Sequence, residues 1–196
     1  MDYATLQADL ALWLTRSDLA ATIPSFIRLA EADIYRRLRI RAQEAEDTLV
    51  VGATTPQRID FPADFLKVIT VTAGECKLDY VTRYTNSNSL SNTQYSTLGF
   101  QGLVGPNTDT DIEIVYYASL PPLVAAGDTN WVLTNAFDVY LYGSLIAAEP
   151  FLKNDARVAV WNTLYEDAIQ KVIDQDKRDK LGEGPLTPTM TQRPTP

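Results

Sequence analysis

Histidine is absent from this chain of 196 residues, and cysteine occurs only once, at Cys76. A chain without histidine has no Ser-His-Asp or Cys-His catalytic arrangement and no imidazole metal ligand. A single cysteine excludes an internal disulfide and a zinc site built from several cysteines. The sequence also lacks a phosphate-binding glycine loop and a dinucleotide fingerprint. We therefore expect a protein that is not an enzyme and that holds no cofactor and no metal.

Acidic residues are the remaining candidates for a metal site or a catalytic site, and their spacing favours neither. Asp109, Asp111 and Glu113 alternate as in a calcium loop, but the required glycine and the distal glutamate are missing. Carboxylates such as Glu31 and Asp33 would suit a glycosidase only if they faced each other across about 5–9 Å of a cleft. A hydrolase is therefore a minor alternative, which a cell-wall zymogram would test.

The chain has few basic residues for its acidic ones: 17 Lys and Arg stand against 25 Asp and Glu, so the formal net charge is −8. Binding of nucleic acid through phosphates depends on Lys and Arg, so the surface as a whole is unlike that of a DNA-binding protein. It suits a surface past which DNA moves without specific binding. The first residues, "MDYATLQADL", have neither a basic start nor a long apolar run, so we expect no signal peptide and no membrane anchor.

Helical periodicity marks the first part of the chain. Asp2 can cap a helix whose apolar residues repeat every three to four positions as far as Leu14. A second helix is predicted to begin near Pro24. It carries one apolar stripe and a second apolar patch that includes Phe26 and Leu29. Two patches indicate contact with more than one neighbour.

The period changes to two from Thr48 onward, which predicts strands. The segment 84–97 is rich in Ser, Thr and Asn, and we expect it to be an exposed loop. The expected strands lie in the stretches "TLVVGAT", "QRIDFP", "LKVITVTA", "CKLDYVTR", "LGFQGLVG" and "DIEIVYYA".

The stretch "DVYLYGSLIAAEPFL" is apolar almost all the way round. Asn135 can cap it as a helix that runs to Glu149, and Pro150 is expected to stop or kink it. A helix without a polar face must be surrounded by other elements, and Gly143 with Ser144 would allow a neighbouring backbone to come close. Asp155 can cap a long, amphipathic last helix.

These elements predict an α+β fold. Helices from the two ends of the chain form a bundle, into which an antiparallel β subdomain is inserted, and an extended C-terminal tail follows. The expected division is 1–47 and 123–180 for the helical parts, 48–122 for the β subdomain and 181–196 for the tail.

Five arginines lie close together around "IYRRLRIRAQ". On a helical wheel Arg37 and Arg41 flank the apolar stripe, while Arg28, Arg36 and Arg39 point the other way. Three interpretations remain open: a DNA-binding helix within 28–41, a solvated or ion-paired face, and a contact with a neighbouring subunit or acidic partner. Phe26 and Leu29 belong to the same possible contact surface.

The end of the chain, "LGEGPLTPTMTQRPTP", is dominated by Pro and Thr and has little with which to build a core. It is either a frayed end without a role or an arm that becomes ordered on a partner. In the second case the docking residues are Leu181, Pro185, Leu186, Pro188, Met190 and Arg193.

Several stretches, in this order, resemble the tail adaptor proteins of tailed bacteriophages, which connect head and tail. They are "LQADLALWLTRSDLAATIPSFIRLAEADIYRRLRIR", "FPADFLKVITV", "LDYVT", "IVYYASLPPL" and "TNWVLTNAFDVYLYGSLIAAEPFLKND". The last block is the most specific, and the resemblance runs from about residue 6 to 179.

The resemblance implies a structural protein of the virion at the head–tail junction, made in the cytoplasm of the bacterial host. It implies a ring, usually of twelve copies, that binds the portal protein through a C-terminal arm. Such a ring extends the DNA channel and gives a platform to the downstream tail or nozzle protein. The expected partners are therefore the portal, neighbouring adaptor subunits and the tail protein, with no membrane.

Overall fold

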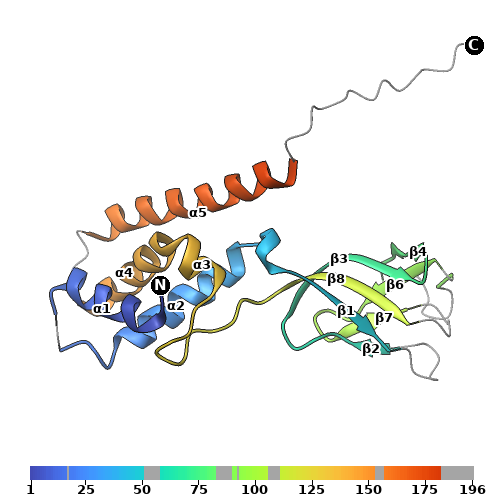
Figure 1. Cartoon of the computed structure of the whole chain (residues 1–196), viewed down its shortest axis with the longest axis horizontal. Helices are drawn as coiled ribbons and strands as arrows, with labels where there is room; N and C mark the ends of the chain where they lie inside the picture. Colours follow the sequence, from blue (N-terminus) through green and yellow to red (C-terminus); the bar gives the residue numbers. More distant parts are fainter. Residues whose placement is uncertain are drawn as a thin grey trace, which may run out of the picture.

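The computed structural model describes residues 1–16, 18–50, 58–82, 90–91, 93–105, 111–152 and 157–181. Helices gather at one end of the molecule and strands at the other, and α5 lies along one side of the helices (Figure 1). The α+β class predicted from the sequence is confirmed.

The first two helices begin where their capping signals predict. Helix α1 (Tyr3–Leu14) starts after Asp2, whose Oδ1 accepts a hydrogen bond of 2.9 Å from the Thr5 amide. Helix α2 (Ile23–Arg37) has Pro24 in its first turn, where the missing amide hydrogen costs nothing.

The apolar stretch around Gly143 begins differently from the prediction. Asn130, not Asn135, is the capping residue: its Oδ1 accepts a hydrogen bond of 2.9 Å from the Leu133 amide and starts the short helix α3 (Trp131–Asn135). Helix α4 (Phe137–Leu152) follows directly and contains Pro150. The proline therefore does not end the helix. It lies in the last turn, where one lost backbone hydrogen bond is the main cost.

Helix α4 is in contact with α1, α2 and α5 (Val158–Leu181). Their apolar side chains form one cluster with those of α3 and the segment before it, here called the helical core. The predicted cap Asp155 lies outside the described residues. Gly143 of α4 lies against α2 and α5: a Cβ atom there would be 3.1 Å from Ala30 Cβ and 3.0 Å from a ring carbon of Tyr165.

The strands form two four-stranded sheets within the described residues. One has the order β1 (Glu44–Leu49), β8 (Ile112–Ala118), β3 (Phe65–Ala73) and β4 (Cys76–Lys77), and its pairs are antiparallel. The other has the order β2 (Arg58–Asp60), β7 (Gly102–Val104), β6 (Gln94–Thr97) and β5 (Asp79–Tyr80). A second apolar cluster, which includes Val71, Leu103 and Ile114, is built from strands of both sheets.

Three details of the strands differ from the prediction. Residues 94–97 were expected in a loop, but they form β6 and bury Tyr95 and Ser96. Strand β5 pairs with β6 in parallel, so the sheets are not antiparallel throughout. Strand β1 begins at Glu44, before the expected start at Thr48, because its pairing with β8 extends to Tyr117.

A buried polar network joins the helical core to the chain that returns from the sheets. Glu31 of α2 is only 6% exposed, and its Oε1 accepts hydrogen bonds from the Leu123 amide at 3.1 Å and from the Tyr140 hydroxyl at 3.3 Å. The Tyr35 hydroxyl donates to the same oxygen at 3.0 Å. Asn130 Nδ2 donates to the Tyr140 oxygen at 2.8 Å. Burial raises the pKa of both tyrosines, so both hydroxyl groups stay protonated donors.

The narrow space around Gly143 predicts the effect of filling it. The Gly143→Val variant should lose about 1–3 kcal/mol in its free energy of unfolding, because the added methyl groups overfill the gap between Ala30 and Tyr165. Urea unfolding monitored by circular dichroism measures this loss. Gly127→Ala is the control, since a Cβ there meets nothing within 4 Å. Equal stability of Gly143→Val and the wild type would contradict the close packing.

Candidate functional site

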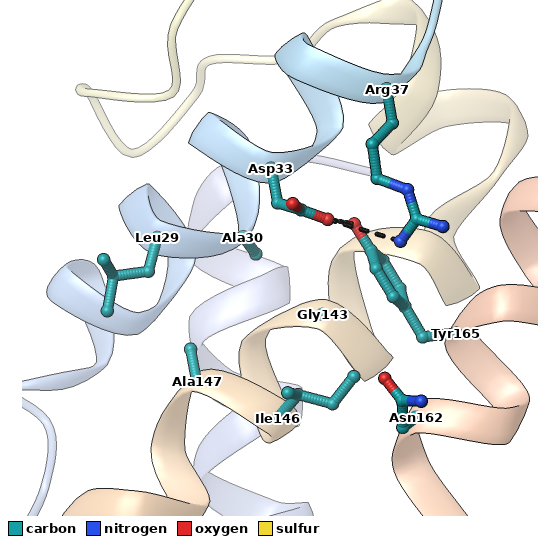
Figure 2. A pocket seen from close by; sticks show the side chains of 9 residues that line it. All are labelled: Leu29, Ala30, Asp33, Arg37, Gly143, Ile146, Ala147, Asn162 and Tyr165. Carbon is teal, nitrogen blue, oxygen red and sulfur yellow. Dashed lines mark hydrogen bonds and ion pairs between the residues drawn. The ribbon is translucent and has the colours of Figure 1, made fainter.

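A groove of about 310 Å³ runs between α2 and α5, with α4 as its floor (Figure 2). Its apolar lining comes from α2 and α4, and its polar residues gather at one end, where Arg37 lies over the ring of Tyr165. Leu29 at its edge is 59% exposed, so an apolar side chain is left uncovered there. The residues that line the groove are Leu29, Ala30, Asp33, Arg37, Gly143, Ile146, Ala147, Asn162 and Tyr165.

The charged groups of the groove are paired with one another. Tyr165 donates a hydrogen bond of 2.9 Å to Asp33 Oδ2, and Arg37 Nη1 is 3.5 Å from the same oxygen. Arg37 also binds Glu166 through two hydrogen bonds, one of them 2.9 Å from Nη1 to Oε1. The Arg37 guanidinium holds the pKa of Glu166 below its usual value, and burial raises the pKa of Tyr165. These groups therefore stabilise the contact of α2 with α5 rather than stand ready to react.

The structure gives no support to the hydrolase alternative. Glu31 is enclosed by three protein donors, and Asp33 is bound to Tyr165 and Arg37. Within the described ranges, no group of three or more His, Cys, Asp or Glu side chains is placed to hold a metal ion. In the same part of the chain, no helix is both long and apolar enough to cross a membrane.

The arginines named in the sequence have different surroundings. Arg28 is exposed on α2, and the Arg36 side chain is 73% exposed, 3.7 Å from Asp33. The Arg39 side chain lies against the backbone, because its Nη1 donates a hydrogen bond of 2.6 Å to the backbone carbonyl oxygen of Tyr35. The helix expected over 28–41 ends at Arg37, and Leu38 has an extended backbone, so Arg39 and Arg41 lie beyond α2 and the helical wheel does not apply to them. The five arginines are therefore not gathered on one helix face.

The two apolar residues of the same surface also separate. Phe26 is buried in the helical core at 4% exposure and meets Phe151 edge to face, with ring centroids 5.7 Å apart. Leu29 remains exposed beside the groove. Within this pair, Leu29 alone has free surface to offer a partner.

The end of α5, just before the tail, is hydrogen-bonded to Arg41 and to strand β8. The Arg41 amide donates to Asp176 Oδ1 at 2.7 Å, and Lys180 reaches the Tyr117 hydroxyl of β8 at 3.2 Å. Leu181 is the last residue of α5. Its side chain, and the other predicted docking residues Pro185, Leu186, Pro188, Met190 and Arg193, lie outside the described residues.

One surface was not predicted from the sequence. Trp13, Tyr142 and Trp161 come together from α1, α4 and α5, with ring centroids 5.7–6.4 Å apart. Trp161 Nε1 donates a hydrogen bond of 3.1 Å to Glu149 Oε1. The signal for this group was Glu149 itself, a buried carboxylate near the end of a largely apolar helix.

A family model described as SU10 adaptor protein matches residues 1–189, almost the whole chain. The chain belongs to the SU10 adaptor protein family. This is a family of phage head–tail adaptors, so the resemblance seen in the sequence is confirmed. None of the curated proteins compared with this adaptor matches it.

Membership of this family makes the chain a phage adaptor protein and implies a structural, non-enzymatic role. It also implies a place at the head–tail junction of the virion and association with portal and tail proteins.

The pairing of Arg37 with Glu166 predicts a pH-dependent stability. Its contribution should be complete above the usual pKa of a glutamate near 4.5 and should be lost as the pH falls through the lower pKa of the folded state. Because the Glu166 side chain is 49% exposed, Arg37→Gln should cost under about 1 kcal/mol at neutral pH. Thermal unfolding of both proteins from pH 7 to 3 measures the difference.

Arg36→Gln is the matched control, because that side chain is largely in solvent. It should leave stability nearly unchanged at every pH. A difference between wild type and Arg37→Gln that stays constant down to pH 3 would contradict the assigned pair.

Proposed function

We propose that this chain is the head-to-tail adaptor that forms a ring beneath the portal, extends the DNA channel and carries the tail. The observation that supports this most is the family match over residues 1–189. Twelve copies is the ring size expected from the resemblance. The adaptor then acts by binding and by ordering of its tail and β loops on the partner, not by catalysis.

Exposed apolar side chains on separate elements support a subunit with more than one neighbour. Leu12 of α1 is 73% exposed, Leu29 of α2 is 59% exposed, and Phe100 of the β6–β7 turn is 79% exposed. A ring of identical subunits requires two different surfaces that fit each other. Exposed apolar side chains on separate elements of one chain could belong to each of these two surfaces.

Each part of the chain has a proposed task. The helical parts, 1–47 and 123–180, form the body of the ring, in which neighbouring subunits lie side by side as helical bundles. The β subdomain, 48–122, contacts the next subunit. The tail, 181–196, is the arm that reaches the portal, with Leu186 and Met190 as apolar anchors between prolines that reduce the entropic cost of ordering.

Charge supports a channel that does not retain DNA. The chain carries a net charge of −8, and Arg37, Arg39 and Arg41 are bound within the chain. The alternative, a DNA-binding accessory protein that uses helix 28–41, would need these guanidinium groups on one exposed face.

Removal of residues 182–196 should abolish co-sedimentation with portal rings while the fold stays intact. The helical core should persist because its last buried member is Val172, well before the deletion. Sedimentation with purified portal measures the loss of binding, and circular dichroism of the free protein measures whether the fold is intact. A second variant, Leu186→Ala with Met190→Ala, should bind weakly, and its control, Thr187→Ala with Thr191→Ala, should bind normally. Full binding by the truncated protein would overturn the arm.

Filter binding to double-stranded DNA at two salt concentrations separates the adaptor from the alternative. The adaptor should show no salt-dependent affinity, and replacing Arg36 and Arg39 by alanine should change nothing. Retention of DNA at low salt that is lost in the doubly substituted protein would favour the DNA-binding function.

A further inference from the structure

Glu149 is an incompletely satisfied carboxylate inside the helical part of the molecule. It is 2% exposed, and while Oε1 accepts the Trp161 hydrogen bond, Oε2 has no hydrogen-bond partner among the described residues. A buried carboxylate normally has both oxygens hydrogen-bonded, because a buried acceptor without a donor has lost its bonds to water and gained none in exchange. By comparison Glu31, on the neighbouring helix, accepts three hydrogen bonds.

The surface above Glu149 is aromatic. Trp13 is 44% exposed and meets Trp161 edge to face, with ring centroids 5.7 Å apart, and Tyr142 stacks on Trp161 at 6.1 Å. Asp9 lies one turn before Trp13 on α1 and is half-buried. An exposed indole ring attracts a cation, and most favourably the flat guanidinium of an arginine. Here one carboxylate lies one turn away on the same helix, and another is bound to the neighbouring Trp161.

The same chain carries a surface of opposite character on α2. Arg28 and Arg36 are exposed two turns apart on the side of the helix that faces away from the core, with Ala32 between them. Leu29, next to Arg28, is 59% exposed. The small residue and the exposed leucine leave room for contact with a flat aromatic surface.

We propose that Trp13, Trp161 and Glu149 of one copy form a receptor for Arg28 of a neighbouring copy. This inference rests on the proposed ring and names one of its interfaces. The guanidinium stacks on the exposed face of Trp13, where it is drawn by Asp9 on the same helix and by the charge of Glu149, which lies at the N–H edge of the neighbouring Trp161 ring. The Glu149 charge acts on the guanidinium without direct contact, because a buried charge is screened little by salt.

Two different surfaces on one subunit, one acidic and aromatic and the other basic with an exposed leucine, define a head-to-tail contact. Such contacts do not end in a dimer: they repeat from copy to copy and close into a ring when the rotation between neighbours allows it. The pairing also removes a cost that the free subunit carries, since the charge of Glu149 gains a counter-ion on assembly.

The test compares self-association of the full chain by sedimentation velocity over a range of concentrations, alone and with portal rings. The variants are Glu149→Gln, Arg28→Gln and the combination of both. Each single change should weaken association about tenfold, and the combined change should weaken it no further, as expected for coupled partners. Glu149→Gln keeps the oxygen that Trp161 needs, so its thermal stability should equal or exceed that of the wild type. Arg157→Gln, an exposed arginine at the start of α5, is the control and should associate normally.

Each result decides the matter. If the wild type assembles while either single variant assembles equally well, or if the two effects simply add, the receptor is wrong and the ring stands. If Lys153→Gln weakens association as much as Glu149→Gln and Arg28→Gln does not, the partner of Glu149 lies in its own chain and the inference fails. If the wild type does not self-associate either alone or in the presence of portal rings, both the proposed ring and the proposed receptor are wrong.

Discussion

The Glu31 carboxylate holds together three parts of the chain that are far apart in sequence. It lies on α2, and it accepts hydrogen bonds from the Leu123 amide and from the Tyr140 hydroxyl of α4. Leu123 belongs to the segment that returns from β8, so this bond fixes where the strands rejoin the helices. A carboxylate at 6% exposure is tolerated only with such partners, and its loss would leave their donors unpaired at a cost of about 1–3 kcal/mol each. The position of the segment that returns from the sheets therefore depends on this carboxylate.

Around that anchor, α4 is enclosed because its sequence offers water almost no polar face. Contacts with α1, α2 and α5 cover its sides, and Gly143 brings Ala30 and Tyr165 close to its backbone. Polar residues at the edges of these contacts pair with each other, as Arg37 does with Glu166 and Asp33. The interior is thus used for stability, and what remains for partners is the surface of α1, α2 and the strand turns.

Local sequence signals were sufficient to predict the elements whose formation depends on residues only a few positions away. The Asp2 cap, the turn at Pro24 and the alternating pattern of β3 each act within a few residues, and the structure has all three. The signals failed where long-range contacts decide. Strand β6 was hidden in polar composition because its stability comes from pairing with β5 and β7, and Asn130 was missed because it acts as a cap and as a donor to Tyr140 at once.

The site shows the same limit more sharply. Arg28, Arg36 and Arg37 lie on α2, but the helix ends at Arg37, so the division on the helical wheel failed for Arg39 and Arg41. The individual partners were not predicted either, because Arg37 binds Glu166, which lies 129 positions later in the sequence. The group around Glu149 needs three helices to come together before it exists. Its one local trace was Glu149, a charged residue in the largely apolar sequence of α4. Within the described residues, Glu149 Oε2 is a buried carboxylate oxygen without a hydrogen-bond partner. Because a buried charge without a partner is costly, the proposed contact with Arg28 of a neighbouring copy would give this carboxylate a counter-ion that the described residues do not supply.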